Sequence, residues 1–570
     1  MDRDLYRKRL FVVMGLFILV ALFIATKLFF VQIIHAERFR DKAEVQYTTP
    51  EKSVFDRGTI FFQKRDTTLV SAATVQSGFK IAFNPSKLLD VEAAYESLSP
   101  LLSLDRDEFM RKAAKKNDPY EEIAEHVPKS TADEILALKI PGVRAVRQNW
   151  RFYPAGTLAS HVIGFMSYRG DDLDGRYGLE KFYNERLVRT QSDLYVNFFA
   201  EIFSEFKSAL SPEAEREGDL VTTIEPSVQV FLEQELTKTK EKWNSDRAAG
   251  LIMNPKTGEI YSFGVYPSYD NNNFTDVASN NVYANPLVES VFEVGSIMKP
   301  IIMAIALEAG VVTPDTMYTD NGSIKVGTKI ISNFDKKARG RVNMQEVLNQ
   351  SLNTGMVYVQ QHTPKDVFHD KLRAFGFGQK TGIDLPGELS GLTSNLETKR
   401  DVEYANISFG QGIAVTPIAM ARALAALGNG GYLVHPHIVN RIDLLSGGTE
   451  EFTLNDEKTQ VLNPQISEDI TRMLVTVFDN YFEGKYKFEH YAVAAKTGTA
   501  QMAKPEGGYY EDRNLHSFFG YFPAYDPQFI VYLYNEYPKN GAQYASQTLI
   551  EPFTNITKFL LSYYDVPPDR

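Results

Sequence analysis

A long uncharged apolar segment near the start of the chain constrains its fold more than any other feature. The residues from Leu10 to Thr26 carry no charge, and after Lys27 the apolar run continues to Ile34. At ~1.5 Å per residue, a helix of this length spans the ~30 Å hydrocarbon core of a bilayer, with Lys27 reaching toward an interface. The sequence therefore predicts a transmembrane anchor over residues 10–34.

The charges that flank this segment predict its orientation. Arg7, Lys8 and Arg9 directly precede it, and positive flanks stay on the cytoplasmic side. We expect residues 1–9 to form a cytoplasmic tail of a single-pass protein of the cytoplasmic membrane, with the remainder on the extracytoplasmic side. The alternative is a cleaved signal peptide, but the apolar run exceeds a typical signal sequence and no A-x-A-like cleavage site follows it.

Length and composition restrict what the rest of the chain can be. The 570 residues are too many for one core and predict several domains. The net charge of -11 argues against nucleic acid as a main partner, because phosphate binding needs a basic surface. The chain has no cysteine, which excludes disulfides, thiolate metal sites and cysteine nucleophiles.

Two regions of different character follow the anchor. Residues 35–217 combine short strand and turn patterns with a charged, helix-rich stretch at 91–138, and contain no dense group of chemical residues. Within them, the aromatic stretch 197–210 favours a helix face packed on a neighbouring domain over a membrane or partner contact. In residues 218–570, the run "AAGLIMNPKTGEIYSFG" predicts a β-hairpin, and strands mixed with helices predict an α/β-type domain on an antiparallel sheet.

Three short motifs in the chain can carry hydroxyl and lysine chemistry, and each occurs more than once. S-x-x-K begins at Ser77, Ser204 and Ser296; K-T-G begins at Lys256, Lys380 and Lys496; S-x-N begins at Ser279 and Ser351. Chance and turn chemistry account for most of these matches, so the local context has to separate them.

The context of Ser296 differs from that of the other serines. Gly295 permits a close approach before it, and Lys299 and Pro300 open a long apolar stretch that predicts a buried helix. A serine at such a helix N-terminus has the positive end of the dipole behind it, and one turn brings Lys299 under Ser296. The alternative is a capping serine with an exposed lysine.

Ser351 and Asn353 lie between two predicted helices, where a plain loop is the alternative reading. The segment "YAVAAKTGTAQM" around Lys496 has the small and β-branched residues of a strand whose edge must stay open, so that a peptide can add as a further strand. The trio therefore occurs in the order S-x-x-K, S-x-N, K-T-G, which is typical of class A β-lactamases and penicillin-binding proteins.

With these residues in order, the chain resembles the class B penicillin-binding proteins, membrane-anchored peptidoglycan D,D-transpeptidases. The resemblance extends over nearly the whole chain through "DRGTI", "RFYPAGTLASHVIGFM", "FGFGQKTGIDLPGE" and "SFGQGIAVTPIAMARALAALGNGG", and "FEVGSIMKP" is closer to the division-type than to the elongation-type branch. The chain departs from the family at "FFQKRDTTL", which replaces the usual R-N-G, at residues 197–210, and at Leu352, where the family often has serine.

The resemblance implies a mixed α/β fold in three parts. An N-terminal transmembrane helix precedes an elongated α+β pedestal of the penicillin-binding protein dimerisation type at 35–217, and a transpeptidase domain with an antiparallel sheet flanked by helices at 218–570.

The resemblance also implies roles for individual residues. Ser296 would attack the D-Ala-D-Ala carbonyl of a stem peptide and release D-alanine, with Lys299 as a neutral general base, its pKa lowered from ~10.4 by burial and by the neighbouring charge of Lys496. Ser351 would relay a proton, Asn353 would bind the substrate amide, and the N–H groups of Ser296 and Thr499 would form the oxyanion hole. Lys496, Thr497 and Thr499 would hold the terminal carboxylate, and Gly498 belongs with them to the substrate-binding residues.

The expected ligands and partners follow from the same resemblance. These are peptidoglycan stem peptides, β-lactams, a polytopic glycan-polymerising glycosyltransferase in the membrane, and other proteins of the cell-wall synthesis complex. No cofactor is expected, and His435 and His437 lack a third ligand for a metal. The alternatives are a catalytically relict membrane scaffold, a membrane-anchored β-lactamase, and a β-lactam sensor.

Overall fold

The computed structural model describes Met14 and residues 56–570, with gaps at 171, 190–215, 278, 399, 453–458 and 505. The predicted anchor and the aromatic stretch 197–210 lie outside the described residues, apart from Met14. Among the described residues, no helix combines the length and the apolar character needed to cross a membrane. The predicted domain borders stay predictions.

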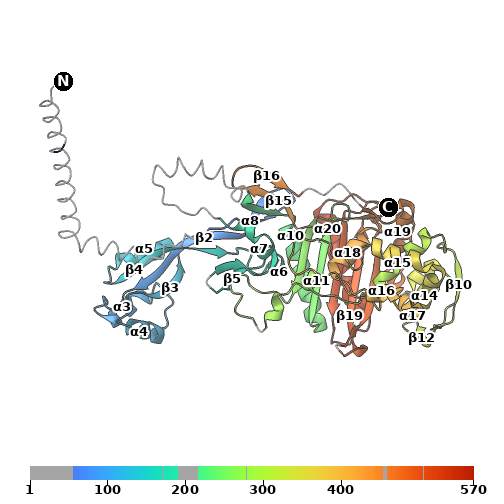
Figure 1. The fold of residues 1–570 in the computed structure, drawn as a ribbon, viewed down its shortest axis with the longest axis horizontal. Helices are drawn as coiled ribbons and strands as arrows, with labels where there is room; N and C mark the ends of the chain where they lie inside the picture. Colours follow the sequence, from blue (N-terminus) through green and yellow to red (C-terminus); the bar gives the residue numbers. More distant parts are fainter. Residues whose placement is uncertain are drawn as a thin grey trace, which may run out of the picture. The chain divides into compact units, whose positions relative to one another are not determined.

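The chain divides into two compact units (Figure 1). The smaller unit contains Val75–Trp150. Three helices pack against strands around Phe83, Leu98 and Phe109, which are buried. The elements of this unit are the second half of β2 (Leu69–Phe83), α3 (Val91–Leu98), α4 (Arg106–Ala113), β3 (Glu121–Val127), α5 (Lys129–Ala137) and most of β4 (Val143–Phe152).

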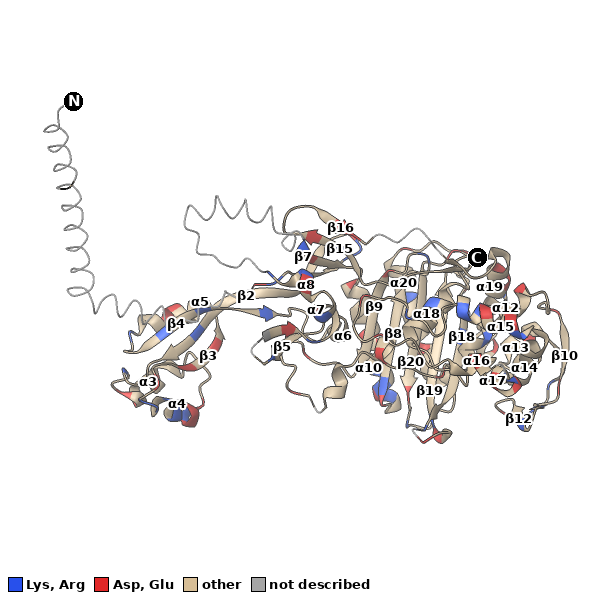
Figure 2. Cartoon of the chain, in the orientation of Figure 1, with Lys and Arg blue, Asp and Glu red and all other residues tan. Residues whose placement is uncertain are grey.

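Strand β3 was not foreseen within the helix-rich stretch 91–138. Its sequence EEIAEHV has three acidic residues, and only its two end residues, Glu121 and Val127, are fully buried. The strand pairs antiparallel with β2, so the backbone ladder holds it rather than an apolar face. Lys/Arg and Asp/Glu are interspersed along the elements of the described chain (Figure 2), as in α4, which carries Asp107 and Glu108 in its first turn and Arg111 and Lys112 in its last.

In the larger unit, the first strand pairs with one from a distant part of the chain. Strand β1 (Ile60–Gln63) runs parallel to β7 (Gly218–Thr222), and β7 pairs antiparallel with β15 (Val439–Leu444). Further elements of this region are β5 (Met166–Arg169), β6 (Asp172–Gly175), β16 (Thr449–Glu451), α6 (Ser160–Ile163), α7 (Gly178–Phe182) and α8 (Asn184–Leu187).

The "DRGTI" motif is explained by this pairing. A Cβ atom on Gly58 would lie 2.2 Å from the carbonyl oxygen of Gly218, so only glycine fits here. Arg57 Nε donates to Glu180 Oε2 (2.7 Å), and Arg151 Nε donates to Glu180 Oε1 (2.6 Å). All three side chains are almost fully buried, so the motif forms a compensated internal ion cluster.

A five-stranded antiparallel sheet lies at the centre of the larger unit, as the sequence predicted. Its order is β18 (Ala494–Ala503), β19 (Tyr509–Phe522), β20 (Phe529–Glu536), β8 (Arg247–Met253) and β9 (Ile260–Tyr266). The predicted hairpin is β8 and β9, which pair directly.

Helices cover both faces of this sheet (Figure 1). In β20, Phe529, Val531 and Leu533 face one core, which includes the buried residues of α10 (Pro226–Trp243) and α20 (Ala545–Tyr563). The alternate residues Ile530, Tyr532 and Tyr534 face the other core, against the remaining helices. These are α11 (Pro286–Glu289), α12 (Lys299–Glu308), α13 (Met344–Asn349), α14 (Asn353–His362), α15 (Lys365–Ala374), α16 (Ser394–Thr398), α17 (Asp401–Ile407), α18 (Pro417–Ala425) and α19 (Pro464–Asp479).

Short elements complete the unit. In the described part of the unit, four two-stranded pairs lie outside the central sheet: β5 with β6, β10 (Met317–Asp320) with β13 (Gly340–Asn343), β11 (Ser323–Val326) with β12 (Lys329–Ser332), and β14 (Tyr432–Leu433) with β17 (Thr459–Gln460). There are also short 3₁₀ turns, η3 (Asn280–Tyr283), η4 (Gly295–Met298) and η5 (Tyr481–Gly484).

Candidate active site

Ser296 lies on the 3₁₀ turn η4, which leads directly into α12. The sequence predicted the N-terminus of an α-helix here, and the tighter turn corrects this. Gly295 has a φ of +61°, and a Cβ atom on it would lie 2.7 Å from the carbonyl oxygen of Thr499 in β18. Its N–H donates to the carbonyl of Gly410 (3.0 Å), so backbone on two sides fixes the position of the serine.

Lys299 is the first residue of α12 and is fully buried. Its Nζ lies 2.6 Å from the carbonyl oxygen of Ser351, 3.1 Å from Ser351 Oγ and 2.8 Å from Asn353 Oδ1. No carboxylate is among these partners. Burial, together with the positive charge of Lys496, holds the pKa of Lys299 well below its ordinary value.

Lys496 reaches the same serine from the central sheet. It lies on β18 and is almost fully buried, and its Nζ donates to Ser351 Oγ (3.1 Å) and to the carbonyl of Thr497 (3.2 Å). Burial lowers its pKa to about 7. Ser351 Oγ thus lies between two buried amines that have no acidic partner among the contacts described.

Ser351 and Asn353 are held in a specific arrangement between α13 and α14. Ser351 has a φ of +54°, in the left-handed region that costs a non-glycine residue about 1 kcal/mol. Asn353 begins α14, and its Nδ2 donates to the carbonyl of Ser332 (3.0 Å). Because the amide nitrogen is used there, its oxygen faces Lys299.

Strand β18 forms the other wall of the site. It is the end strand of the central sheet and pairs with β19 only. A Cβ atom on Gly498 would lie 2.7 Å from the carbonyl oxygen of Val294, so the strand can approach η4 only with glycine there. Thr499 Oγ1 accepts a hydrogen bond from the N–H of Ala545 at the start of α20 (3.0 Å). The predicted small-residue edge strand is therefore present beside Ser296.

Sequence reasoning missed two side chains that join the walls of the site. The N–H of Thr497 donates to the hydroxyl of Tyr481 (3.1 Å), a residue with no recognisable sequence signal. Glu293 lies within "FEVGS", and its Oε1 accepts from the N–H of Gly412 (2.8 Å) and from the hydroxyl of Tyr509 (3.0 Å). Burial raises the pKa of Glu293 despite these two hydrogen bonds.

The other matches to the three motifs lie in unrelated settings. Lys80 pairs with Glu122 and Glu125 in the smaller unit, and Lys256 pairs with Asp526 beside a hairpin turn. Glu388 closes the loop after Lys380, because its carboxylate accepts hydrogen bonds from the N–H groups of Thr381 and Gly382. Within the described residues, only the set that begins with Ser296 brings all three motifs together.

The two histidines of "VHPHIV" have structural contacts. His437 is buried, its Nδ1 lies 3.0 Å from the carbonyl oxygen of His435, and its ring stacks on Phe452. His435 Nε2 lies 3.1 Å from the carbonyl oxygen of Gly382. In the part of the chain that the structure describes, no group of three or more His, Asp or Glu side chains could hold a metal ion.

Comparison with known proteins agrees with this geometry. The family described as "Penicillin binding protein transpeptidase domain" matches residues 248–557, and "Penicillin-binding Protein dimerisation domain" matches residues 54–197. Stage V sporulation protein D of Bacillus subtilis is 31% identical and covers 99% of this chain and 87% of its own length. The peptidoglycan D,D-transpeptidase FtsI of Escherichia coli is 27% identical over 78% of this chain and 73% of its own length.

Solved structures share the fold at lower identity. Penicillin binding protein 3 of Mycobacterium tuberculosis, complexed with aztreonam, is 22% identical with a TM-score of 0.68, and the match covers 91% of this chain and 98% of that one. Penicillin Binding Protein 2X of Streptococcus thermophilus is 21% identical with a TM-score of 0.71, and the match covers 90% of this chain and 80% of that one.

Proposed function

This chain belongs to the penicillin-binding proteins that carry a transpeptidase domain, and from that premise we propose that it is a serine-type peptidoglycan D,D-transpeptidase. It cross-links stem peptides through an acyl-enzyme, releases D-alanine and is a target of β-lactams. Relatives named FtsI agree with the division-type branch that the motifs favoured, and so with a role in septal synthesis. The observation that carries the proposal is the pair of buried lysines around Ser351, beside Ser296.

Lys299 acts as the general base toward Ser296. A hydroxyl is a poor nucleophile until its proton is removed, and a lysine can accept that proton only when it is neutral. A neutral amine has two hydrogens and one lone pair. The carbonyl of Ser351 and Oδ1 of Asn353 can only accept, so they take the two hydrogens. The lone pair of Lys299 is then left to accept a proton from a hydroxyl. This arrangement supports Lys299 as a base, with a pKa that burial has lowered.

The reaction proceeds in two steps. Ser296 Oγ attacks the carbonyl of D-Ala-D-Ala while its proton passes to Lys299, and the N–H groups of Ser296 and Thr499 stabilise the oxyanion. Ser351 relays the proton to the departing amine of D-alanine, which leaves the acyl-enzyme. An amine from a second stem peptide then attacks the ester, forms the cross-link and frees Ser296.

The remaining residues of the site hold the substrate. Lys496, Thr497 and Thr499 bind the terminal carboxylate, and Asn353 binds the substrate amide. Gly498 lets the backbone of the peptide lie along β18, where the small side chains leave the edge accessible to an added strand. No cofactor takes part in either step.

The test is labelling with fluorescent penicillin followed by mass spectrometry. Wild type should carry one adduct, on the peptide that contains Ser296, and Ser296→Ala should not be labelled. Ser77→Ala is the matched control, because Ser77 also begins an S-x-x-K motif but lies on the smaller unit, and it should label as wild type does. Equal labelling of Ser296→Ala would refute the assignment.

The competing functions make different predictions for the same assay. A relict scaffold would not be acylated at all. A β-lactamase would lose its label rapidly, because water hydrolyses its acyl-enzyme. A transpeptidase would keep its acyl-enzyme for a time in which a β-lactamase completes many turnovers. A sensor would also keep its label but would not cross-link stem peptides.

Membrane attachment and partner complete the proposal. The segment 10–34 anchors the chain with the N-terminus inside, and the single helix contacts a polytopic glycosyltransferase that makes the glycan strands, within a larger cell-wall synthesis complex. Helices in lipid pack closely at small residues, and Ala21 and Ala25 share one face of the segment better than Gly15 does with either. Replacing Ala21 and Ala25 with Phe should weaken co-purification of the two proteins and leave penicillin labelling intact. Unchanged co-purification would reject this face.

A further inference from the structure

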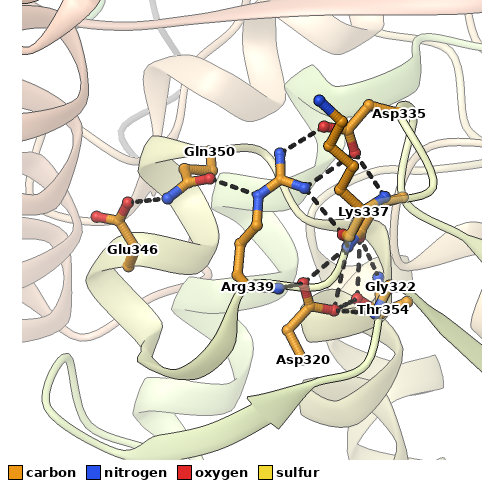
Figure 3. A network of polar contacts seen from close by, with 9 residues as sticks. Asp320, Gly322, Asp335, Lys337, Arg339, Glu346, Gln350 and Thr354 are labelled. Atoms are coloured by element: carbon orange, nitrogen blue, oxygen red, sulfur yellow. Dashed lines mark hydrogen bonds and ion pairs between the residues drawn. The ribbon is translucent and has the colours of Figure 1, made fainter.

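A small set of side chains outside the three motifs holds both ends of the Ser351–Asn353 turn. These are Asp320, Asn333, Asp335 and Arg339, which we call the brace. They lie on the strand pairs and loops between α12 and α13, apart from the central sheet. Figure 3 shows the network that they form with residues on either side of the turn.

Asp320 is the centre of one half of the brace. Its side chain is almost fully buried, and Oδ1 accepts from the N–H of Gly322 (3.0 Å) and from the hydroxyl of Thr354 (2.7 Å). Its Oδ2 accepts from the N–H of Arg339 (2.9 Å) and from Asn333 Nδ2 (3.0 Å). Burial alone would raise the pKa of Asp320, but these hydrogen bonds hold it below its ordinary value, so the carboxylate is charged.

Arg339 is the centre of the other half. Its guanidinium lies between the carboxylate of Asp335 and the amide of Gln350 (Figure 3). Two nitrogens donate to the two oxygens of Asp335 (3.0 and 2.8 Å), and Nε donates to Gln350 Oε1 (2.7 Å). The Nε2 of Gln350 in turn donates to Glu346 on α13. A planar guanidinium suits this geometry, because the paired contact with the carboxylate fixes the direction of Nε.

The two halves act on the residues that flank the turn. Gln350 directly precedes Ser351, and Thr354 directly follows Asn353. Asn353 itself donates to the carbonyl of Ser332, the neighbour of Asn333 in the brace. A left-handed serine persists only where its surroundings specify that conformation, and the brace supplies contacts before and after it.

The conformation of Ser351 determines its contacts with the two buried lysines. With Ser351 in its left-handed conformation, its carbonyl and hydroxyl both contact Lys299, and the hydroxyl also contacts Lys496. A relaxed backbone at this residue would rotate the carbonyl and the hydroxyl away from one or both amines. The amide oxygen of Asn353 would lose its direction as well if Ser332 moved.

We propose that Arg339 is a positioning residue for acyl transfer, which acts through Gln350 to hold Ser351 between Lys299 and Lys496. The proposal rests on the proposed function and adds to it a residue that contacts neither the substrate nor the reacting atoms. If Arg339 were merely structural, its loss would lower stability and leave the rate of acylation of the folded protein unchanged.

The experiment compares Arg339→Ala and Gln350→Ala with wild type in acylation by a fluorescent penicillin. The non-covalent dissociation constant and the acylation rate constant are measured separately from the concentration dependence. We expect the rate constant to fall about 10- to 100-fold, the range that a displacement of up to ~1 Å in a catalytic group produces, with the dissociation constant changed less than the rate. Arg341→Ala is the matched control, since Arg341 is exposed and lies two residues after Arg339, in β13, and it should acylate at the wild-type rate.

A double variant tests whether Arg339 acts through Gln350. If it does, Arg339→Ala with Gln350→Ala should be no slower than the slower single variant, because both remove the same link. If the loss of rate in the double variant is the product of the two single losses, Arg339 does not act through Gln350. Arg339→Lys should not restore the rate, because a lysine cannot hold Asp335 and Gln350 together in a fixed direction.

Two outcomes overturn the proposal in a distinguishable way. If Ser296→Ala still labels, the proposed function itself fails. If Ser296 is the labelled residue and Arg339→Ala acylates within twofold of Arg341→Ala, only the positioning role fails. If Arg339→Ala does not fold, Gln350→Ala decides alone, since it removes the contact but leaves the pair of Arg339 with Asp335 intact, and a wild-type rate would refute the role.

Discussion

The larger unit contains two buried clusters of charged side chains that follow opposite rules. Where strand β1 pairs with β7, Arg57 and Arg151 both donate to Glu180, whose carboxylate is their shared counter-ion. In the active site, Lys299 and Lys496 are equally buried, but their contacts are carbonyl, amide and hydroxyl oxygens. The first arrangement favours the charged forms, and the second favours the neutral ones.

The difference shows how the same fold separates stability from chemistry. A compensated cluster keeps its protons fixed over the working pH range and connects segments that are far apart in sequence. A cluster of like charges without counter-ions gives up a proton at much lower pH than lysine ordinarily does, which is what a general base requires. Five experiments can break or sharpen this contrast.

The largest effect is expected from Lys299→Met. Without its base, Ser296 should acylate about 10²- to 10⁴-fold more slowly, the range that general base catalysis commonly contributes. The free energy of unfolding should change by only about 1 kcal/mol, because the hydrogen bonds lost by the neighbours are offset by removal of a buried amine. Acylation kinetics and urea unfolding measure the two quantities. A large loss of stability with an unchanged rate would reverse the roles of the two clusters.

Glu180→Gln should produce the opposite pattern. The substitution keeps the shape but removes the carboxylate charge that both buried guanidinium groups contact, so the free energy of unfolding should fall by about 3–5 kcal/mol. Acylation, normalised to the folded fraction by active-site titration, should stay within twofold of wild type. The control is Glu551→Gln, whose pair with Lys242 is exposed and should contribute less than ~1 kcal/mol. If Glu180→Gln and Glu551→Gln were equally stable, the Glu180 cluster would not have the stabilising role given to it here.

The stability of both clusters should rise with pH, but in different pH ranges. The pKa of Lys496 is about 7 in the folded chain against 10.5 in its ordinary state, so the unfolded chain binds more protons between these values and stability rises with pH there. The pKa of Glu180 is lowered despite its burial, by Arg151 and Arg57, so its contribution is present above its ordinary pKa and is lost as pH falls through the lowered value. The Lys496→Met variant should flatten the alkaline rise in melting temperature, and an unchanged rise would contradict the assignment.

The rate of acylation should follow the protonation of the active-site lysines. It should fall as pH drops through the lowered pKa of Lys299, because the protonated amine cannot accept the proton of Ser296. The profile should flatten in Lys299→Met, which lacks the amine that accepts the proton of Ser296. A wild-type profile in this variant would point to a different base.

The smallest effect is expected from Lys80→Ala in the smaller unit. Lys80 belongs to another S-x-x-K match, but it pairs with Glu122 and Glu125 at a partly exposed site. The loss should change the free energy of unfolding by less than ~1 kcal/mol and leave acylation unchanged. Slower acylation would show that the motif at Ser77 also contributes to the chemistry.

Much of the site could be predicted from sequence because its parts are local. The hairpin of β8 and β9 is specified by a turn between two apolar runs, and the small residues around Lys496 specify an edge strand. The spacing of Ser296 and Lys299 places the serine one turn before the lysine, on η4 and at the start of α12. The order of the three motifs supplied the family resemblance, and with it the residues to examine.

The rest depended on contacts between segments that are far apart in the chain. Nothing within S-x-x-K distinguishes Ser77 from Ser296. The flanking sequence favours Ser296, but the burial of Lys299 and the approach of β18 to Gly295 come from the tertiary structure. The 3₁₀ turn at Ser296, in place of the expected helix start, follows from the close approach of Thr499 and Gly410 to Gly295. These are packing constraints that local propensity does not encode.

The sequence by itself determined which side chains are present and in what order, because residue type and local spacing are written in it directly. Only the tertiary structure decided that Lys299 and Lys496 meet at Ser351 without a carboxylate, that Ser351 is left-handed, and that Arg339 reaches Gln350. The physical reason is that a pKa shift, a strained dihedral angle and a hydrogen-bond direction are all set by the neighbours that folding brings together, and those neighbours come from distant parts of the chain.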